Sequence, residues 1–232
     1  MLTGEKPTWL TFDCYGTLIQ WDEGAHAAVA RVLEKHGRTD VSIKAVIARH
    51  DAREHVLEQA EPFMKFRQVV ALSFVEAMAE FGIHTDQADF DLLIQSISAM
   101  PPHPEVVAAL VELKAMGFKL CIVSNTEDAV IAGNVAQLGG TIDRVITAEQ
   151  AQAYKPSPRL FRHAWRELGV QVDEVVHICA SPLLDLTAAR ELGFRCVWID
   201  RGTGRQPPHD YRPHATLPDL SGVPALFRSL GW

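Results

Sequence analysis

Short apolar runs alternate with amphipathic segments along most of this 232-residue sequence. The apolar runs read WLTFDCY, FKLCIVSN, DRVITAEQ, VVHICAS and FRCVWID. Between them lie segments such as HPEVVAALVELKAMG, PRLFRHAWRELG and LLDLTAARELG, each ending in a glycine suited to close a helix. Near-continuous apolar strands that alternate with helices are typical of a parallel sheet covered on both faces. The pattern therefore predicts an α/β fold.

Residues 21–100 interrupt this alternation. They read as three consecutive helices, GAHAAVARVLEKHG, SIKAVIARHDAREHVLEQ and MKFRQVVALSFVEAMAEFG, with no convincing strand between them. The segment MPPHP at 100–104 then ends the helical stretch. We therefore expect a core domain made of residues 1–20 and 101–232, with 21–100 as a helical cap inserted after the first strand. Active sites of open α/β sheets lie beyond the carboxyl ends of the strands, so this insertion is expected to cover the site as a lid.

Composition narrows the class of protein. Hydrophobic residues make up 47% and charged residues 22%, and the formal net charge is -7. An acidic balance argues against a nucleic-acid binder, which needs clustered Lys and Arg. No apolar run has the length of a membrane span, and the opening MLTGEKPTWL lacks the apolar region of a signal peptide, so we expect a cytoplasmic protein without a membrane partner.

The four cysteines lie in or beside apolar, strand-like stretches and show no C-x-x-C spacing. Small buried thiols explain such positions. Cys14 stands out because it directly follows Asp13. The ten histidines show no metal-ligand spacing and are interpreted as structural or surface residues.

Polar side chains gather where the predicted strands end. Because the carboxyl ends of parallel strands meet at one edge of a sheet, these residues should lie close together. They are Asp13, Tyr15, Gly16 and Thr17 after the first strand, Ser124 and Asn125 after the second, Lys155 after the third, and Ala180, Ser181 and Asp185 after the fourth.

The order and spacing of these motifs resemble the haloacid dehalogenase superfamily of aspartate-nucleophile hydrolases. The likeness covers the whole chain: FDCYGTL as first motif, IVSN as second, YKPSPRLF as third, and a late aspartate as fourth. It implies a Rossmann-like parallel sheet with an inserted helical cap.

The residue two places after the nucleophile separates branches of that superfamily. Phosphatases carry a second aspartate there as general acid, and this chain has Tyr15, a poor proton donor near neutral pH because phenols titrate around ~10. A leaving halide needs no proton. Asp13 and Asp185 alone would also make a thin magnesium site. The resemblance is therefore closest to the L-2-haloacid dehalogenase branch, acting on a small carboxylate substrate without metal or cofactor.

The resemblance also implies roles for individual residues. Asp13 would displace halide with inversion and form an ester, which water would hydrolyse to a D-2-hydroxy acid. Lys155 would keep Asp13 ionised, Thr17 would orient it, and Asp185 would orient Lys155 or help activate water. The remaining assignments are Ser124 and Asn125 as hydrogen-bonding partners of substrate or Asp13, Arg49 as the arginine that meets halide or carboxylate, with Arg53 one turn away as its rival, and Tyr15, Cys14, Phe66 and Ser181 as substrate-side residues.

Three positions depart from the family pattern: Phe161 replaces a tyrosine, and Ala180 and Pro182 stand where the family has serine and asparagine. Either Ser181 or Tyr154 substitutes for the lost polar groups, or the substrate differs. The alternatives are an epoxide or strained ring opened by the same ester route, a magnesium-dependent phosphatase, and a non-catalytic relic of the fold. A homodimer is expected because dimers are usual in the resembling family.

Overall fold

The computed structural model describes residues 2–232, and within them the strands form one six-stranded parallel sheet in the order β3-β2-β1-β4-β5-β6. The strands are β1 Trp9–Phe12, β2 Lys119–Ser124, β3 Arg144–Thr147, β4 Val175–Cys179, β5 Arg195–Ile199 and β6 Ala215–Leu217. The first five coincide with the apolar runs of the sequence, as predicted. The edge strand β6 was not predicted, because it is only three residues long and none of them is fully buried.

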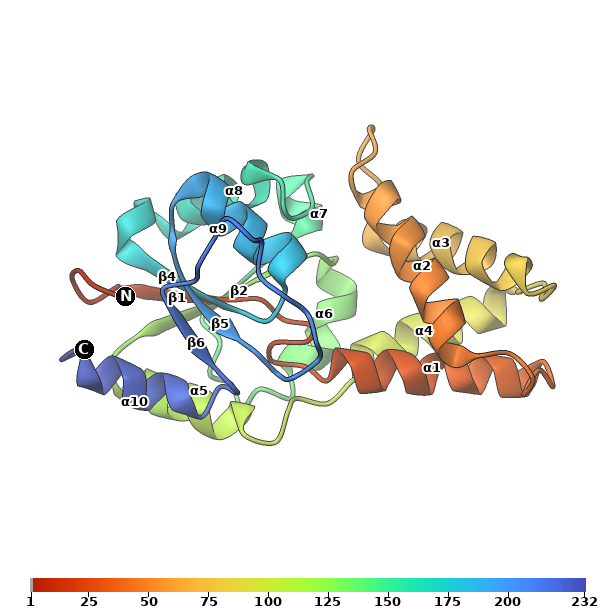
Figure 1. Cartoon of the computed structure of the whole chain (residues 1–232), viewed down its shortest axis with the longest axis horizontal. Coiled ribbons are helices and arrows are strands. Elements are labelled where there is room, and N and C mark those ends of the chain that lie inside the picture. The colour runs from red at the N-terminus through yellow and green to blue at the C-terminus, as the bar shows by residue number, and fades with distance from the viewer. Residues whose placement is uncertain (1) are drawn as a thin grey trace.

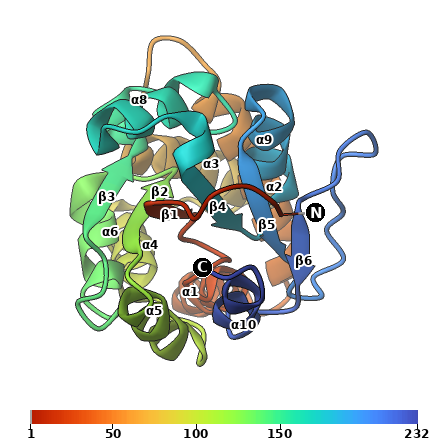
Figure 2. The same cartoon turned by 90° about the vertical axis from the view of Figure 1, so that its left-hand side faces the viewer.

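Helices cover both faces of the sheet (Figures 1 and 2). In these views α8 and α9 lie on one face, and α5 and α10 on the other. Side chains of β1 show the period-two alternation that this arrangement requires, since Leu10 and Phe12 belong to one buried cluster and Trp9 to the other. The core helices are α5 Val106–Ala115, α6 Asp128–Val135, α7 Ala148–Ala151, α8 Pro158–Leu168, α9 Thr187–Leu192 and α10 Gly222–Ser229.

The glycines read as helix ends act as predicted. Gly169 and Gly193 close α8 and α9 with φ values of 67° and 74°, a left-handed conformation that other residues adopt at a cost. Before α9 the chain makes the π-helical turn η2, Pro182–Leu186, and before β4 the short 3-10 turn η1, Val172–Glu174.

Four helices separate β1 from α5 in the sequence and stand beyond one end of the sheet (Figure 1). They are α1 Trp21–Lys35, α2 Ile43–Glu58, α3 Phe66–Glu80 and α4 Gln87–Ala99. We call this segment the helical insertion. The sequence indicated three of these helices, and α4 was missed.

The strand order reverses at β1, which pairs with β2 on one side and β4 on the other. Such a reversal leaves a crevice beyond the carboxyl ends of the central strands, where ligands of open α/β sheets bind. Among residues 2–232, no helix has both the length and the apolar character needed to cross a membrane.

Candidate active site

Asp13 directly follows the central strand β1 and is held on both carboxylate oxygens. Its Oδ1 lies 2.9 Å from Lys155 Nζ, and its Oδ2 accepts a hydrogen bond of 2.7 Å from the Thr17 hydroxyl. The Thr17 oxygen in turn accepts from the backbone N–H of Ala180 at 2.8 Å. The Asp13 side chain is 10% exposed, so one narrow approach to the carboxylate remains open.

Lys155 bridges two buried carboxylates. Its Nζ lies 2.9 Å from Asp13 Oδ1 and 2.8 Å from Asp185 Oδ1, and its side chain is fully buried. Burial alone would lower the pKa of Lys155, but the two carboxylates outweigh it and raise that pKa, so the ammonium stays charged. Burial raises the pKa of Asp13 against the opposing charge of Lys155. For Asp185, Lys155 and His177 overcome the effect of burial and lower the pKa.

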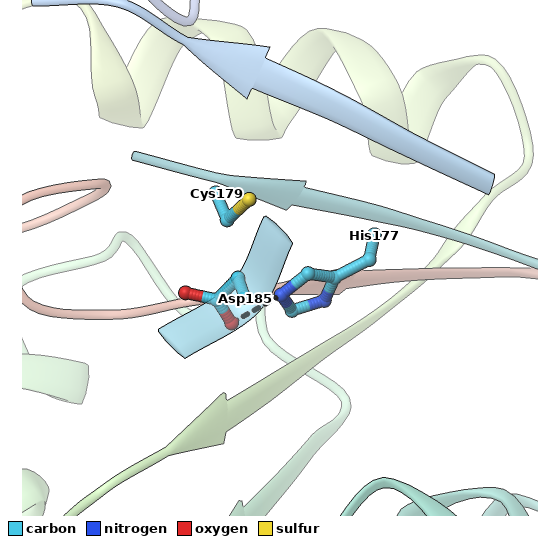
Figure 3. A group of neighbouring side chains, drawn as sticks. All are labelled: His177, Cys179 and Asp185. Carbon is cyan, nitrogen blue, oxygen red and sulfur yellow. Dashed lines mark hydrogen bonds and ion pairs between the residues drawn. The ribbon is translucent and has the colours of Figure 1, made fainter. Parts of the chain in front are cut away.

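His177, in the middle of β4, hydrogen-bonds the carboxylate of Asp185 that pairs with Lys155. Its Nε2 lies 2.8 Å from Asp185 Oδ1, as Figure 3 shows, and its Nδ1 lies 2.9 Å from the Thr11 hydroxyl. Because an ionised carboxylate only accepts, Nε2–H donates to Asp185 and Nδ1 accepts from Thr11. The sequence analysis treated this histidine as structural and missed its role. The available signal was a single polar side chain inside the run VVHICAS.

Two positions around Asp185 do not fit a bound metal ion. His177, Cys179 and Asp185 offer ligand atoms within 4.8 Å of one another (Figure 3), but Asp185 Oδ1 already binds Lys155 and His177. The thiol of Cys179 is buried, which raises its pKa well above the ordinary value. Between Asp13 and Asp185, where a magnesium ion would bridge two carboxylates, the structure has the ammonium of Lys155.

A cavity of about 650 Å³ opens above Asp13, between the strand ends and the helical insertion. Its walls combine residues from β-strand ends, the insertion and the loop after β5. They are Asp13, Tyr15, Gly16, Trp21, Asp51, Glu54, His55, Glu58, Phe66, Ser124, Asn125, Ala180, Ser181, Pro182, Leu183, Leu184, Thr187, Arg205, Gln206 and Pro208. A space of this size is typical of a small-molecule site.

Most residues predicted for the site lie on this wall. Tyr15 donates its hydroxyl hydrogen to Asn134 at 2.8 Å, and Phe66 contributes a buried apolar surface. Ser124 Oγ is fully buried and has no hydrogen-bond partner within residues 2–232. Ser181, also on the wall, accepts from the Leu184 N–H at 3.3 Å and so caps the turn that carries Asp185.

Asn125 links helix α2 of the insertion to the loop that carries Lys155. Its Nδ2 lies 3.2 Å from each carboxylate oxygen of Glu58 on α2 and 3.3 Å from the Lys155 carbonyl. Its Oδ1 accepts from the Lys155 N–H at 2.6 Å. Asn125 therefore positions the backbone of the lysine rather than contacting Asp13 itself.

The predicted arginine does not lie in the site. Arg49 is 62% exposed and forms an ion pair of 3.0 Å with Glu80, and Arg53 pairs with Glu76 on the same side of the insertion. Helix periodicity directs both arginines to the face of α2 that packs along α3, away from the cavity. Cys14 also lies off the cavity wall, because its thiol is completely buried in the core beneath Asp13.

The cavity wall instead includes Arg205, from the loop after β5, for which the sequence predicted no role. Its two terminal nitrogens bind the carboxylate of Asp22 at 2.9 and 2.7 Å, and its side chain keeps 46% exposure. No local periodicity marks a loop arginine, so the sequence offered no signal for it.

The residues that depart from the family pattern have defined surroundings. Phe161 packs edge-on against His177, with ring centroids 5.4 Å apart. Ala180 contributes its backbone N–H, and Pro182 starts the turn η2. Tyr154 donates its hydroxyl to the Met64 carbonyl at 2.8 Å, so that hydroxyl does not replace the lost polar groups, whereas Ser181 does reach the cavity wall.

Comparison with known proteins identifies the family of this chain. The family model for haloacid dehalogenase-like hydrolases matches residues 8–193, and the chain belongs to this family. It is similar to (S)-2-haloacid dehalogenase 4A of Burkholderia cepacia, 26% identical with 87% of this chain and 86% of the relative covered. It is 27% identical to (S)-2-haloacid dehalogenase of Pseudomonas sp. strain YL, covering 95% and 94%. The L-2-haloacid dehalogenase of Xanthobacter autotrophicus shares the fold, with a TM-score of 0.83 at 20% identity and coverage of 97% and 99%.

Proposed function

We propose that this protein hydrolyses the carbon–halogen bond of a small L-2-haloacid through an ester formed on Asp13. One observation carries the proposal: the Asp13 carboxylate opens into the cavity while Lys155 and Thr17 fix both of its oxygens. A carboxylate held in one orientation is suited to in-line attack, because positioning removes much of the entropic barrier. The curated relatives, named as (S)-2-haloacid dehalogenases, support the choice of reaction.

In the first step an Asp13 oxygen attacks the carbon that bears the halogen. The new C–O bond forms as the C–halogen bond breaks, and the halide leaves with the bonding electrons. Because the attack comes from the side opposite the halogen, the configuration of the carbon is inverted. This step needs no proton donor. Tyr15 fits such a step, because burial raises the pKa of its phenol and its hydroxyl hydrogen is engaged by Asn134.

In the second step water attacks the carbonyl carbon of the ester and releases the 2-hydroxy acid. One oxygen of Asp13 thereby leaves with the product, and the oxygen of water replaces it. Lys155 stabilises the negative charge that develops on the ester oxygen. Asp185 Oδ2 is buried and has no hydrogen-bond partner in the described part of the chain, which makes it the candidate acceptor for a water proton.

Arg205 is proposed to bind the substrate carboxylate. It takes the role that the sequence assigned to Arg49, since it is the arginine on the cavity wall within residues 2–232. A planar guanidinium binds a carboxylate through two parallel hydrogen bonds, as it does here with Asp22. Substrate and Asp22 would then share or exchange this arginine.

Halide release from L- and D-2-chloropropionate, with excess EDTA present, tests the proposal. Wild type should release halide from the L isomer, and Asp13→Asn should lose this activity. Magnesium-dependent hydrolysis of a phosphate ester, without chloride release, would instead support a phosphatase. The ion pair that places Lys155 between Asp13 and Asp185 argues against that alternative. Cytoplasmic location and a homodimer remain predictions.

A further inference from the structure

The wall of the cavity formed by α2 is acidic. Asp51, Glu54 and Glu58 follow one another at spacings of three and four residues, so they share one helix face, and all three line the cavity. Glu54 is 8% exposed and Glu58 is 9% exposed. Carboxyl groups this deeply buried are costly unless a partner offsets the loss of water.

Two buried atoms on this wall have no partner. Glu54 Oε1 makes no hydrogen bond to any of residues 2–232, and its nearest basic atom, His50 Nε2, lies at 3.9 Å. Ser124 Oγ, which belongs to β2 rather than α2, is completely buried and equally unpartnered. Two residues that line the cavity, one on α2 and one on β2, thus carry a buried hydrogen-bonding atom without a partner within residues 2–232.

The cations near the cavity are already engaged in the part of the chain described here. Arg205 binds Asp22 through both terminal nitrogens, and Lys155 lies beneath the wall between Asp13 and Asp185. His55 Nδ1 lies 2.6 Å from the Asp51 carbonyl of its own helix. Among residues 2–232, the only basic side chain within ion-pair distance of Glu54 or Glu58 is His50, whose Nε2 lies 3.9 Å from Glu54 Oε1.

Without a cation these carboxyl groups retain protons. Burial, with Asp51 adding to it, raises the pKa of Glu54 to about 8. Burial and the neighbouring Glu54 raise the pKa of Glu58 well above its usual range, while Asn125 opposes the rise. His50 offers no compensating charge, because burial lowers its pKa to about 4.

We propose that Glu54 and Glu58 bind an ammonium group of the substrate, so that the protein acts on a 2-haloacid that also carries a positively charged amino group. The assignment of a carbon–halogen bond as the reacting group of this substrate rests on the function proposed above. An ammonium donates three hydrogen bonds and carries the positive charge that the α2 wall lacks, whereas an unsubstituted haloacid leaves Glu54 and Glu58 without a cationic partner. Arg205 holds the carboxylate of the same zwitterionic molecule.

Binding without chemistry tests this recognition directly. Calorimetric titration compares n-butylammonium chloride with sodium butyrate, at constant ionic strength, on wild type and on the double variant Glu54→Gln and Glu58→Gln. These changes keep the shape of both side chains, and Glu34→Gln, on the exposed face of α1, is the matched control for a lost negative charge. We expect wild type and the control to bind butylammonium at least tenfold more tightly than the double variant does.

A kinetic comparison then separates this inference from the proposed function. Halide release is measured for 6-amino-2-chlorohexanoate and for 2-chlorohexanoate, which lacks only the amino group. We expect kcat/KM of wild type to favour the amino compound at least tenfold, and the double variant to lose that preference. Equal rates in wild type, with no butylammonium binding, would overturn the inference and leave dehalogenation intact. Butylammonium binding that the double variant loses, without halide release from either compound, supports ammonium recognition and rejects dehalogenation.

Discussion

The Nζ atom of Lys155 lies 2.9 Å from Asp13 Oδ1. Asp13 directly follows β1, and Lys155 lies in the loop after α7, which follows β3. The two residues are 142 positions apart in the sequence. The ion pair joins the first strand to the segment after β3, and the positive charge of Lys155 opposes the rise in the pKa of Asp13 that burial causes.

Removal of Lys155 should therefore damage both activity and stability. Lys155→Met leaves Asp13 and Asp185 facing each other in a buried site, and losing one partner of such a pair costs about 3–5 kcal/mol. We expect halide release to fall more than about 100-fold, because Asp13 then holds a proton at neutral pH. Halide assays and urea unfolding measure the two effects. Lys114→Met, which breaks an exposed pair with Asp143, should change the free energy of unfolding by less than about 1 kcal/mol. Equal losses in both variants would contradict the assigned role.

His177 should act through Asp185 rather than on the substrate. His177→Gln replaces the rigid imidazole by a flexible amide and weakens the hydrogen bond to the charged Asp185 Oδ1, which is worth about 1.5–3 kcal/mol. We expect a lower kcat with little change in KM, since the cavity wall does not contain His177. Steady-state kinetics on a resolved substrate check the split. His163→Gln, at a half-buried position of α8 whose imidazole contacts Arg166, is the control and should leave kcat unchanged. A raised KM with an unaltered kcat would show that His177 shapes binding instead.

Much of this site was accessible from the sequence, because the residues at the ends of parallel strands must meet. Asp13, Thr17, Ser124, Lys155 and Asp185 follow apolar runs directly, and the sheet brings them together by its topology. What the sequence could not give is the orientation of residues on the insertion. Arg49 and Glu54 both lie on α2, and only the packing of α2 on α3 shows which one faces the cavity.

The acidic wall formed by α2 could have been recognised from the sequence. Asp51, Glu54 and Glu58 repeat with the helix period, where a buried face would ordinarily be apolar. By contrast, Arg205 lies in the loop 201–214, where no periodicity relates position to direction. Its place on the cavity wall follows only from the tertiary structure, and the same holds for the short edge strand β6.

Replacing Arg205 should weaken substrate binding, whereas replacing Arg49 should not. Arg205→Gln removes the guanidinium from the cavity wall and should raise KM for a 2-haloacid at least about tenfold, with kcat affected less. Arg49→Gln breaks only an exposed pair with Glu80 and should leave KM within about twofold. Michaelis–Menten analysis of both variants decides between the two residues. A raised KM in the Arg49 variant alone would restore the assignment made from the sequence.

Burial of Glu54 should make stability depend on pH. The pKa of Glu54 is about 8 in the folded protein, against 4.5 for the same side chain in water, so the folded state binds the proton more tightly than the unfolded chain does. The contribution of this group to stability is therefore greatest below pH 4.5 and falls as the pH rises to about 8. Glu54→Gln removes this loss, and we expect its Tm at pH 9 to exceed that of wild type by at least about 3 °C, with a smaller difference at pH 5. A calorimetric series across this range, with Glu34→Gln as control, measures it. A Tm difference that does not vary with pH would mean that Glu54 is ionised throughout.

The covalent role of Asp13 is tested most directly by a single turnover in water labelled with heavy oxygen, with enzyme in excess over an L-2-haloacid. Mass spectrometry then locates the label in the hydroxy acid product and in the peptide that contains Asp13. If an ester forms on Asp13, the label enters the Asp13 carboxylate and the product of that first turnover carries unlabelled hydroxyl oxygen. Label in the product hydroxyl, with none in the Asp13 peptide, would show that water attacks the substrate directly and would contradict the mechanism.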